Sequence, residues 1–126
     1  MSGPAARRRA IVLIDHGSRR AEANAMLESV AAALQRRVPE RIVAIAHMEL
    51  APPSLADAVE TCVAAGAREI VVHPYFLAPG AHATRDIPAQ AAQVAARHPD
   101  VSIRVSAPLG VHEGLLDVIL ARVDSA

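Results

Sequence analysis

Four short apolar runs, each followed by a segment with helical spacing, constrain the fold of this chain most strongly. The segments after the runs repeat apolar residues every three or four positions, as amphipathic helices do. The runs themselves are rich in branched aliphatic residues and end at turn residues, which is typical of buried strands. They span Ile11 to Asp15, Arg41 to His47, Glu69 to His73, and Val101 to Val105. This alternation predicts an α/β fold, a single domain whose parallel four-stranded sheet is flanked by helices on both faces.

Finer patterns place the boundaries of the helices. The first helix is expected from about Ala21 to Arg37, where Pro39 blocks continuation. Ser54 is expected to cap the second helix. A long loop, Pro74 to Thr84, is expected before the third. Alternation in the last strand predicts a sheet edge, and a final helix follows with an apolar face made by Leu115, Leu116, Ile119 and Val123.

Composition limits the classes of protein to consider. The 126 residues suit one domain, with a tail at 1–10 and the domain at 11–126. Hydrophobic residues make up 52% and the formal net charge is zero, so no global field recruits nucleic acid or anionic lipid. The single Cys62 excludes a disulfide framework and a thiolate metal site, and its position on a helix face predicts a buried structural thiol.

Apolar segments of membrane-spanning length are missing from the sequence, and its start does not resemble a signal peptide. We therefore expect a cytoplasmic protein with no membrane partner and no nucleic-acid partner. The chain also lacks GxGxxG and GxxxxGK[ST] patterns, which weakens dinucleotide and nucleoside-triphosphate sites as alternatives.

Each predicted strand is followed closely by a histidine or an acid, and these residues are His16, Glu49, His82 and His112. Carboxyl ends of parallel strands lie on one edge of a sheet, where open α/β proteins build their sites. Two imidazoles and a carboxylate there could hold a divalent metal with open positions, or accept protons. The plainer alternative is that His16 is a satisfied surface residue and Glu49 a solvent-exposed loop acid. His112 is the weaker candidate.

Neighbouring residues could bind an anionic ligand or shape a pocket. Arg19 and Arg20 precede a helix, where positive charge opposes the macrodipole, so an anionic ligand is indicated. Arg85 could reach a ligand carboxylate. Ser18 either belongs to the site or caps the helix. The only two aromatic residues, Tyr75 and Phe76, either form a pocket wall or close the top of the core.

The order of these motifs resembles the small sirohydrochlorin chelatase family, short chelatases of the cobalamin and siroheme pathways that insert Co²⁺, Fe²⁺ or Ni²⁺. The resemblance covers nearly the whole chain from Ile11 onward. It is carried by His16-Gly-Ser-Arg19 with Asn24, Glu49-Leu-Ala-x-Pro-Ser54, Pro74-x-Phe-Leu77, Gly80-x-His82, Asp86-Ile-Pro88 and Leu109-Gly110-x-His112.

The resemblance implies a class II chelatase fold with flavodoxin-like layering, and a chain with one such domain is expected to form a homodimer. It assigns His16 and His82 to metal handling and Glu49 as their acidic partner. The implied substrate is a sirohydrochlorin-like tetrapyrrole, the expected ion is Co²⁺ before Fe²⁺ or Ni²⁺, and no organic cofactor is implied. Asp15 departs from the family pattern, because a small neutral residue is expected before that histidine.

Three other functions remain open. Histidine phosphatases also place a His-Gly pair after the first strand, but with an arginine before it, where this chain has Asp15. A non-catalytic carrier of metal or tetrapyrrole would keep His16 and His82 without accelerating insertion. A purely structural module would leave the ordered motifs unexplained.

Overall fold

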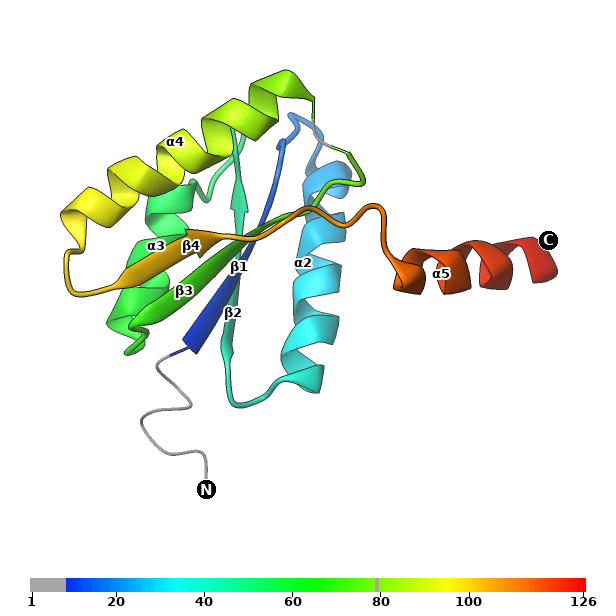
Figure 1. Cartoon of the computed structure of the whole chain (residues 1–126), viewed down its shortest axis with the longest axis horizontal. Helices are drawn as coiled ribbons and strands as arrows, with labels where there is room; N and C mark the ends of the chain where they lie inside the picture. The colour runs from blue at the N-terminus through cyan, green and yellow to red at the C-terminus, as the bar shows by residue number, and fades with distance from the viewer. Residues whose placement is uncertain (1–8, 79) are drawn as a thin grey trace.

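The computed structural model describes residues 9–78 and 80–126, and its centre is one parallel sheet (Figure 1). The strands are β1 (Arg9–Asp15), β2 (Ile42–His47), β3 (Glu69–Pro74) and β4 (Ser102–Val105). They pair in the order β2-β1-β3-β4, and each neighbouring pair is parallel. The predicted fold class and the edge position of the fourth strand are therefore confirmed.

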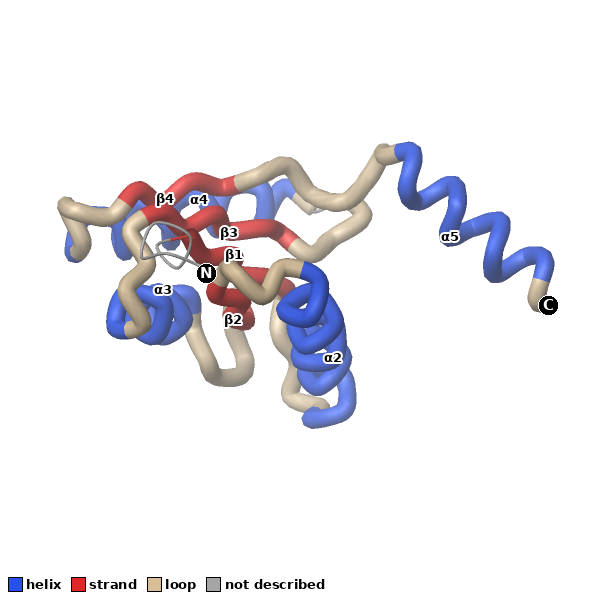
Figure 2. The backbone as a smooth tube through the Cα atoms, turned by 90° about the horizontal axis from the view of Figure 1, so that it is seen from below, coloured by secondary structure: helices blue, strands red, loops and turns tan. Residues whose placement is uncertain are grey.

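Three helices flank the sheet, and their placement follows from the strand order. They are α2 (Ala21–Arg37), α3 (Leu55–Ala64) and α4 (Ala81–Arg97). The chain steps from β1 to β2 in one direction and returns past β1 to reach β3 and β4. With right-handed crossovers, α2 must then cover one face while α3 and α4 cover the other, as Figures 1 and 2 show.

The face beneath α3 and α4 carries the main hydrophobic core. Alternate residues of the two central strands, such as Val12 and Val72, point into it and are fully buried. The helices contribute Leu55, Val59, Cys62, Ile87, Ala91 and Val94. The prediction of a buried Cys62 is confirmed, since its exposed fraction is 0%. Burial of each large aliphatic side chain here contributes about 1.5–3 kcal/mol.

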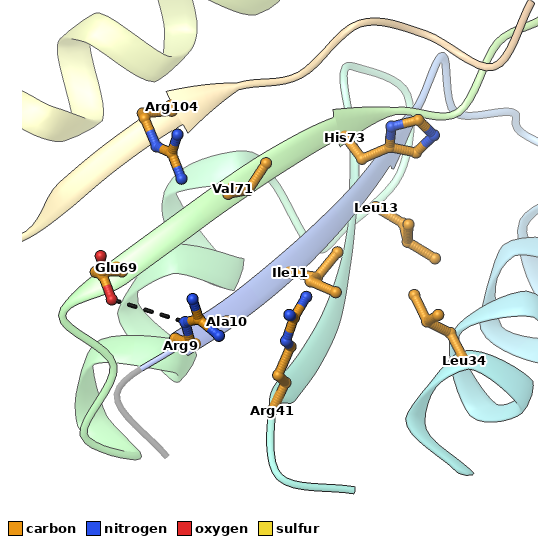
Figure 3. Close-up of a pocket in the computed structure, with 10 residues that line it drawn as sticks. All are labelled: Arg9, Ala10, Ile11, Leu13, Leu34, Arg41, Glu69, Val71, His73 and Arg104. Carbon is orange, nitrogen blue, oxygen red and sulfur yellow. Dashed lines mark ion pairs between the residues drawn. The ribbon is translucent and has the colours of Figure 1, made fainter. Parts of the chain in front are cut away.

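The opposite face is covered only in part. Leu13 of β1 and Leu27 of α2 are buried there. Beside them a groove of about 400 Å³ stays open over β1, β3 and β4 (Figure 3). The last helix, α5 (Glu113–Asp124), does not fill it: the helix contains no buried residue and points away from the sheet. The predicted helix forms, but its apolar face contacts no core in the isolated chain.

The bounds of β2, β3 and β4 differ from the sequence-based expectation by one residue each, and two other boundaries differ by more. Strand β1 begins at Arg9, two residues before Ile11, while residues 1–8 of the predicted tail lie outside the described part of the chain. The predicted end of the loop from Pro74 to Thr84 is wrong, because α4 already begins at Ala81. The apolar anchor of that first turn is Ala83, which is small enough to give a weak periodic signal, although it is 1% exposed. Within residues 9–78 and 80–126, no helix combines the length and apolarity needed to span a bilayer.

Candidate functional site at the carboxyl ends of the strands

The candidate residues gather at one edge of the sheet, as the parallel topology requires. His16 follows β1 directly, Glu49 follows β2, Tyr75 follows β3, and His112 lies beyond β4. The carboxyl ends of parallel strands define a common rim, and such rims are where open α/β sheets bind their ligands. The prediction that these strand ends meet at one rim is confirmed.

The turn after His16 is pressed against the loop that carries Glu49. The backbone N–H of Glu49 donates to the carbonyl of His16 at 3.1 Å. Gly17 has a φ of +87°, and a Cβ added to it would overlap the carbonyl oxygen of Glu49. Only glycine fits a positive φ with the backbone approaching so closely. The His-Gly pair therefore fixes the approach of residues 16 and 49 at the level of the backbone.

A side-chain contact between Asp15 and the buried His47 supports this turn from below. The Oδ1 atom of Asp15 lies 2.6 Å from Nδ1 of His47 and also accepts the N–H of Gly17 at 3.0 Å. His47 is 2% exposed. Asp15 therefore directs its carboxylate toward His47 and the turn backbone, and in doing so orients the segment that carries His16. Neither residue was predicted as part of the site, although both stand at predicted strand ends.

A second set of bonds orders the segment between the turn and α2. Asn24 accepts the N–H of Ser18 at 2.9 Å and donates to the carbonyl of Ser18 at 2.7 Å. The hydroxyl of Ser18 accepts the N–H of Arg20 at 3.0 Å. Arg20 is itself the N-cap residue, without a side-chain cap. Ser18 thus stabilises the turn that precedes α2. The alternative, in which Ser18 caps this helix, is wrong.

A shallow cavity of about 280 Å³ opens beside this turn. Its lining includes His16, Ser18, Asn24, Tyr75 and Phe76. The rings of His16 and Phe76 meet edge to face, with centroids 5.3 Å apart and an interplanar angle of 89°. Phe76 also packs against the core. The two aromatic residues thus do line a pocket, and Phe76 joins that pocket to the hydrophobic interior.

His82 occupies the first turn of α4 rather than a loop. Its Nε2 lies 2.8 Å from Oδ2 of Asp86, one helical turn later, and the His82 side chain is 58% exposed. This contact fixes the orientation of the imidazole ring and leaves Nδ1 outside the pair. Asp86 thus orients His82 from one helical turn further along α4. Arg85 Nε lies 3.6 Å from the same carboxylate.

The three predicted metal-handling residues share the rim but do not form a compact cluster. Among residues 9–78 and 80–126, no group of three or more His, Cys, Asp or Glu side chains is close enough to hold an ion. His82 is also absent from the lining of the cavity beside His16. The described part of the chain therefore brings these three side chains to one edge of the sheet without assembling them into a three-ligand metal site.

The remaining candidates are exposed at the same rim. Arg20 bonds Glu22 at 2.9 Å, and both side chains are more than two-thirds exposed, so the pair is easily exchanged for another carboxylate. Arg19 is likewise exposed. His112 accepts the N–H of Gly114 through Nδ1 at 2.9 Å and so caps α5. That bond commits one nitrogen of His112 to structure.

A family model and individual relatives of this chain indicate the same protein family. The family model described as CbiX matches residues 10–126. The chloroplastic sirohydrochlorin ferrochelatase of Arabidopsis thaliana is 46% identical over 113 residues, which cover 90% of this chain and 50% of that protein. The sirohydrochlorin cobaltochelatase of Methanocaldococcus jannaschii is 31% identical, with 90% of this chain and 96% of that protein covered.

A solved structure agrees with the fold. The sirohydrochlorin chelatase SirB from Bacillus subtilis subspecies spizizenii, solved in complex with cobalt, superposes with a TM-score of 0.84 and 30% identity, covering 94% of this chain and 50% of that one. The chain spans about half the length, or less, of several curated relatives that it matches.

Proposed function

This chain belongs to the CbiX family, and we propose that it is a sirohydrochlorin chelatase, a lyase-type enzyme that inserts a divalent metal into the tetrapyrrole. The observation that carries the proposal is the turn bearing His16. The bonds of Asp15 to Gly17 and His47 hold this turn at an open cavity that is walled by Phe76. An imidazole oriented on a rigid sheet and facing open space can meet a large planar ligand.

The reaction asks for a base and for ligands that do not hold the ion too firmly. Insertion removes two pyrrole N–H protons, strips water from the ion, and requires the macrocycle to bend. Neutral imidazoles at His16 and His82 suit both roles, as proton acceptor or as passing ligand. The pairing of His82 with Asp86 orients the imidazole ring of His82 at the rim. Glu49, whose backbone contacts the His16 turn, supplies the third group.

The rim also suits the charge of the substrate. A sirohydrochlorin-like tetrapyrrole bears many carboxylates, and guanidinium groups bind carboxylates in a two-point geometry. Arg19, Arg20 and Arg85 are exposed near the candidate histidines and would make these contacts. The reaction proposed needs no organic cofactor, because the metal ion is itself a substrate.

The metal and the assembly are the finer parts of the proposal. We take Co²⁺ as the ion used, with Fe²⁺ or Ni²⁺ as the other possible ions, in cobalamin or siroheme biosynthesis. Relatives named for cobalt and for iron both match this chain, so names alone do not choose between these two ions. We include in the proposal a cytoplasmic location and a homodimer, in which a second copy would complete the surroundings of the rim.

Two alternatives to the chelatase differ in how well they fit the site. A phosphatase would need a positive environment at the His-Gly turn, whereas Asp15 places a carboxylate beneath it. A non-catalytic carrier would use the same residues and differs only in that it would not accelerate insertion. The assay described next separates the carrier from the chelatase.

The test is an anaerobic absorbance assay with sirohydrochlorin and, in separate reactions, Co²⁺, Fe²⁺ and Ni²⁺. We expect acceleration over the spontaneous rate, fastest with Co²⁺, and a loss of about 10²-fold in His16→Ala and His82→Ala. His98→Ala is the matched control, because His98 lies at the opposite end of α4 from His82 and pairs with Glu60.

Acceleration lost in the rim variants but kept in His98→Ala would support the enzyme and its residues. Folded wild-type protein that binds the ion or the tetrapyrrole without accelerating insertion would overturn the enzyme in favour of the carrier.

A further inference from the structure

Leu50, the residue after Glu49, has a backbone conformation that leucine rarely adopts. Its φ is +72°, and among the residues that the structure describes it is the only one other than glycine with a positive φ. This left-handed region brings a Cβ too close to the following carbonyl oxygen. The side chain is also 55% exposed, so packing in the core does not offset the strain. Backbone strain of this kind gathers at ligand sites, which makes Leu50 a candidate for contact with a ligand.

Hydrogen bonds on both sides of Leu50 hold its loop in place. The N–H of Glu49 donates to the carbonyl of His16 at 3.1 Å. The N–H of His47 donates to the carbonyl of Pro53 at 2.8 Å, which closes the loop around Leu50. The backbone at Leu50 is therefore fixed by the same contacts that build the His16 turn.

An exposed leucine lies on each side of His16 along the rim. The strand order β2-β1-β3 places the end of β1, which His16 follows, between the ends of β2 and β3. Leu50 is the third residue after β2, and Leu77 is the third residue after β3. Leu77 is 64% exposed. Neighbouring strands lie about 4.8 Å apart, so three strand ends span roughly 10 Å. That span suits a large flat ring.

The surface between the two leucines is apolar at its centre and basic at its margin. Phe76 and Met26 line the cavity beside His16, and Met26 is 62% exposed. Arg19 and Arg20 are exposed where the chain leaves the His16 turn. A ligand that matches this surface has an apolar face and anionic groups around its edge. A tetrapyrrole ring with peripheral carboxylates has that chemistry.

We propose that Leu50 and Leu77, with His16 between them, form an apolar platform that contacts the face of the tetrapyrrole ring. Covering the two leucines removes apolar surface from water, which offsets the strain at Leu50 when the ring is bound. The inference rests on the proposed function, because it specifies residues that bind the substrate of that same site. Both leucines bind the ring and take no part in proton transfer.

The first test compares the same substitution at the two leucines. Glycine adopts a positive φ without steric cost, so Leu50→Gly should raise the midpoint of urea unfolding by about 0.3 M. Leu77 has no positive φ. Leu77→Gly should therefore lower the midpoint by about 0.3 M, because glycine gives the unfolded chain more freedom.

The second test measures binding of metal-free sirohydrochlorin by absorbance titration. Both glycine variants should raise the Kd about tenfold, because each removes one apolar contact with the ring. In the insertion assay the KM for sirohydrochlorin should rise, while kcat stays within about twofold. Leu50→Met keeps an apolar side chain and should retain most of the binding. Loss of binding together with a gain in stability is a result that a purely structural role for Leu50 does not produce.

Gly66→Leu is the matched control. Gly66 has a φ of +100°, and no atom lies within 4 Å of a Cβ added to it. It precedes β3, at the edge of the sheet opposite to the rim. The variant therefore creates a second strained leucine far from the candidate site. It should lower the urea midpoint and leave the Kd for sirohydrochlorin unchanged, which separates instability from loss of binding.

The outcomes separate the platform from the chelatase. Wild-type protein that binds and metallates sirohydrochlorin, with an unchanged Kd in both glycine variants, would overturn the platform and leave the chelatase standing. A lower mass of Leu50→Gly in sedimentation equilibrium, again with an unchanged Kd, would place Leu50 against a second copy and would also overturn the platform. Wild-type protein without insertion activity, whose tetrapyrrole binding is lost in Leu50→Gly, would support the platform and overturn the chelatase. Wild-type protein that does not bind sirohydrochlorin would overturn both.

Discussion

The two faces of the sheet are built from the same strands and yet end in different states. Val72 and Val71 are neighbours on β3, and alternation sends them to opposite faces. Val72 is fully buried beneath α3 and α4, whereas Val71 lines the open groove beside α2. Apolar residues in a strand therefore predict that a face of the sheet will be buried. They do not specify which helix, or which second molecule, covers that face.

We expect the largest effect in the rate at which a reagent labels Cys62, on the sheet face that α3 and α4 cover. Burial raises the pKa of the Cys62 thiol to about 11, so the reactive thiolate is scarce at pH 8 and the side chain is also shielded. We expect labelling by a thiol reagent to be at least about 10³-fold slower in folded than in urea-unfolded protein, since it requires opening of the core.

Val111→Cys is the control for that labelling measurement, because Val111 is 100% exposed. Its added thiol should react at nearly the same rate in folded and unfolded protein. Fast labelling of Cys62 in the folded wild type would contradict a closed core on this face.

The adjacent valines allow the two faces to be compared directly. Val72→Ala removes buried methyl groups and leaves a cavity, so we expect the free energy of unfolding to fall by about 2–3 kcal/mol. Val71→Ala should cost about 1 kcal/mol or less in dilute protein. Urea unfolding followed by circular dichroism measures both.

Protein concentration sharpens the same comparison. If a second copy covers the groove, the loss in Val71→Ala should grow as concentration rises, while the loss in Val72→Ala should not. Equal losses in the two variants at low concentration would remove the distinction between a closed and an open face.

The rim is supported by the contact between Asp15 and His47, which joins the ends of β1 and β2. Asp15→Ala leaves the buried His47 and the N–H of Gly17 without their acceptor, so we expect a loss of about 1.5–2 kcal/mol in unfolding free energy. The chelatase rate should fall as well, because the His16 turn loses its support. Asp15→Asn keeps an oxygen at the same place and should recover most of both losses. If the Asn variant were as impaired as the Ala variant, the negative charge itself would be required.

The smallest effect concerns protonation on the open face. Desolvation lowers the pKa of His73, against a weaker opposing bond to the Ala107 backbone, and the hydroxyl of Ser106 lies 2.8 Å from its Nδ1. The folded chain thus favours neutral His73. Its contribution to stability is complete above the ordinary histidine pKa of about 6.5 and is lost as pH falls through the lower folded value.

That contribution is measured as a difference between two proteins, since other histidines titrate in the same range. Urea unfolding of wild type and His73→Gln should show a smaller decline below pH 6.5 in the variant. Identical pH profiles would show that His73 is not protected on this face.

Much of the fold follows from local pattern. The strand runs, the Ser54 cap and the start of α2 at Ala21 could each be predicted from a few neighbouring residues. A capping box at Ser54, where Ser54 and Asp57 bond each other's backbone, needs only the right residues three positions apart. Because the strands are parallel, their ends meet at one rim, and the candidate residues His16 and Glu49 could be placed there in advance.

Other parts of the site depended on contacts that no local pattern contains. Asp15 and His47 are 32 residues apart, and only the register of β1 with β2 makes them a pair. The pairing of His82 with Asp86 required α4 to begin earlier than its apolar residues indicated.

The sequence by itself determined the order of the elements, the parallel sheet and the rim that carries the candidate histidines, because those follow from periodicity and chain topology. Only the tertiary structure decided that Asp15 supports the His16 turn and that one face of the sheet stays open while α5 extends beyond it. The physical reason is that an apolar stripe specifies that a surface must be buried, whereas the surface that buries it is chosen by packing in three dimensions.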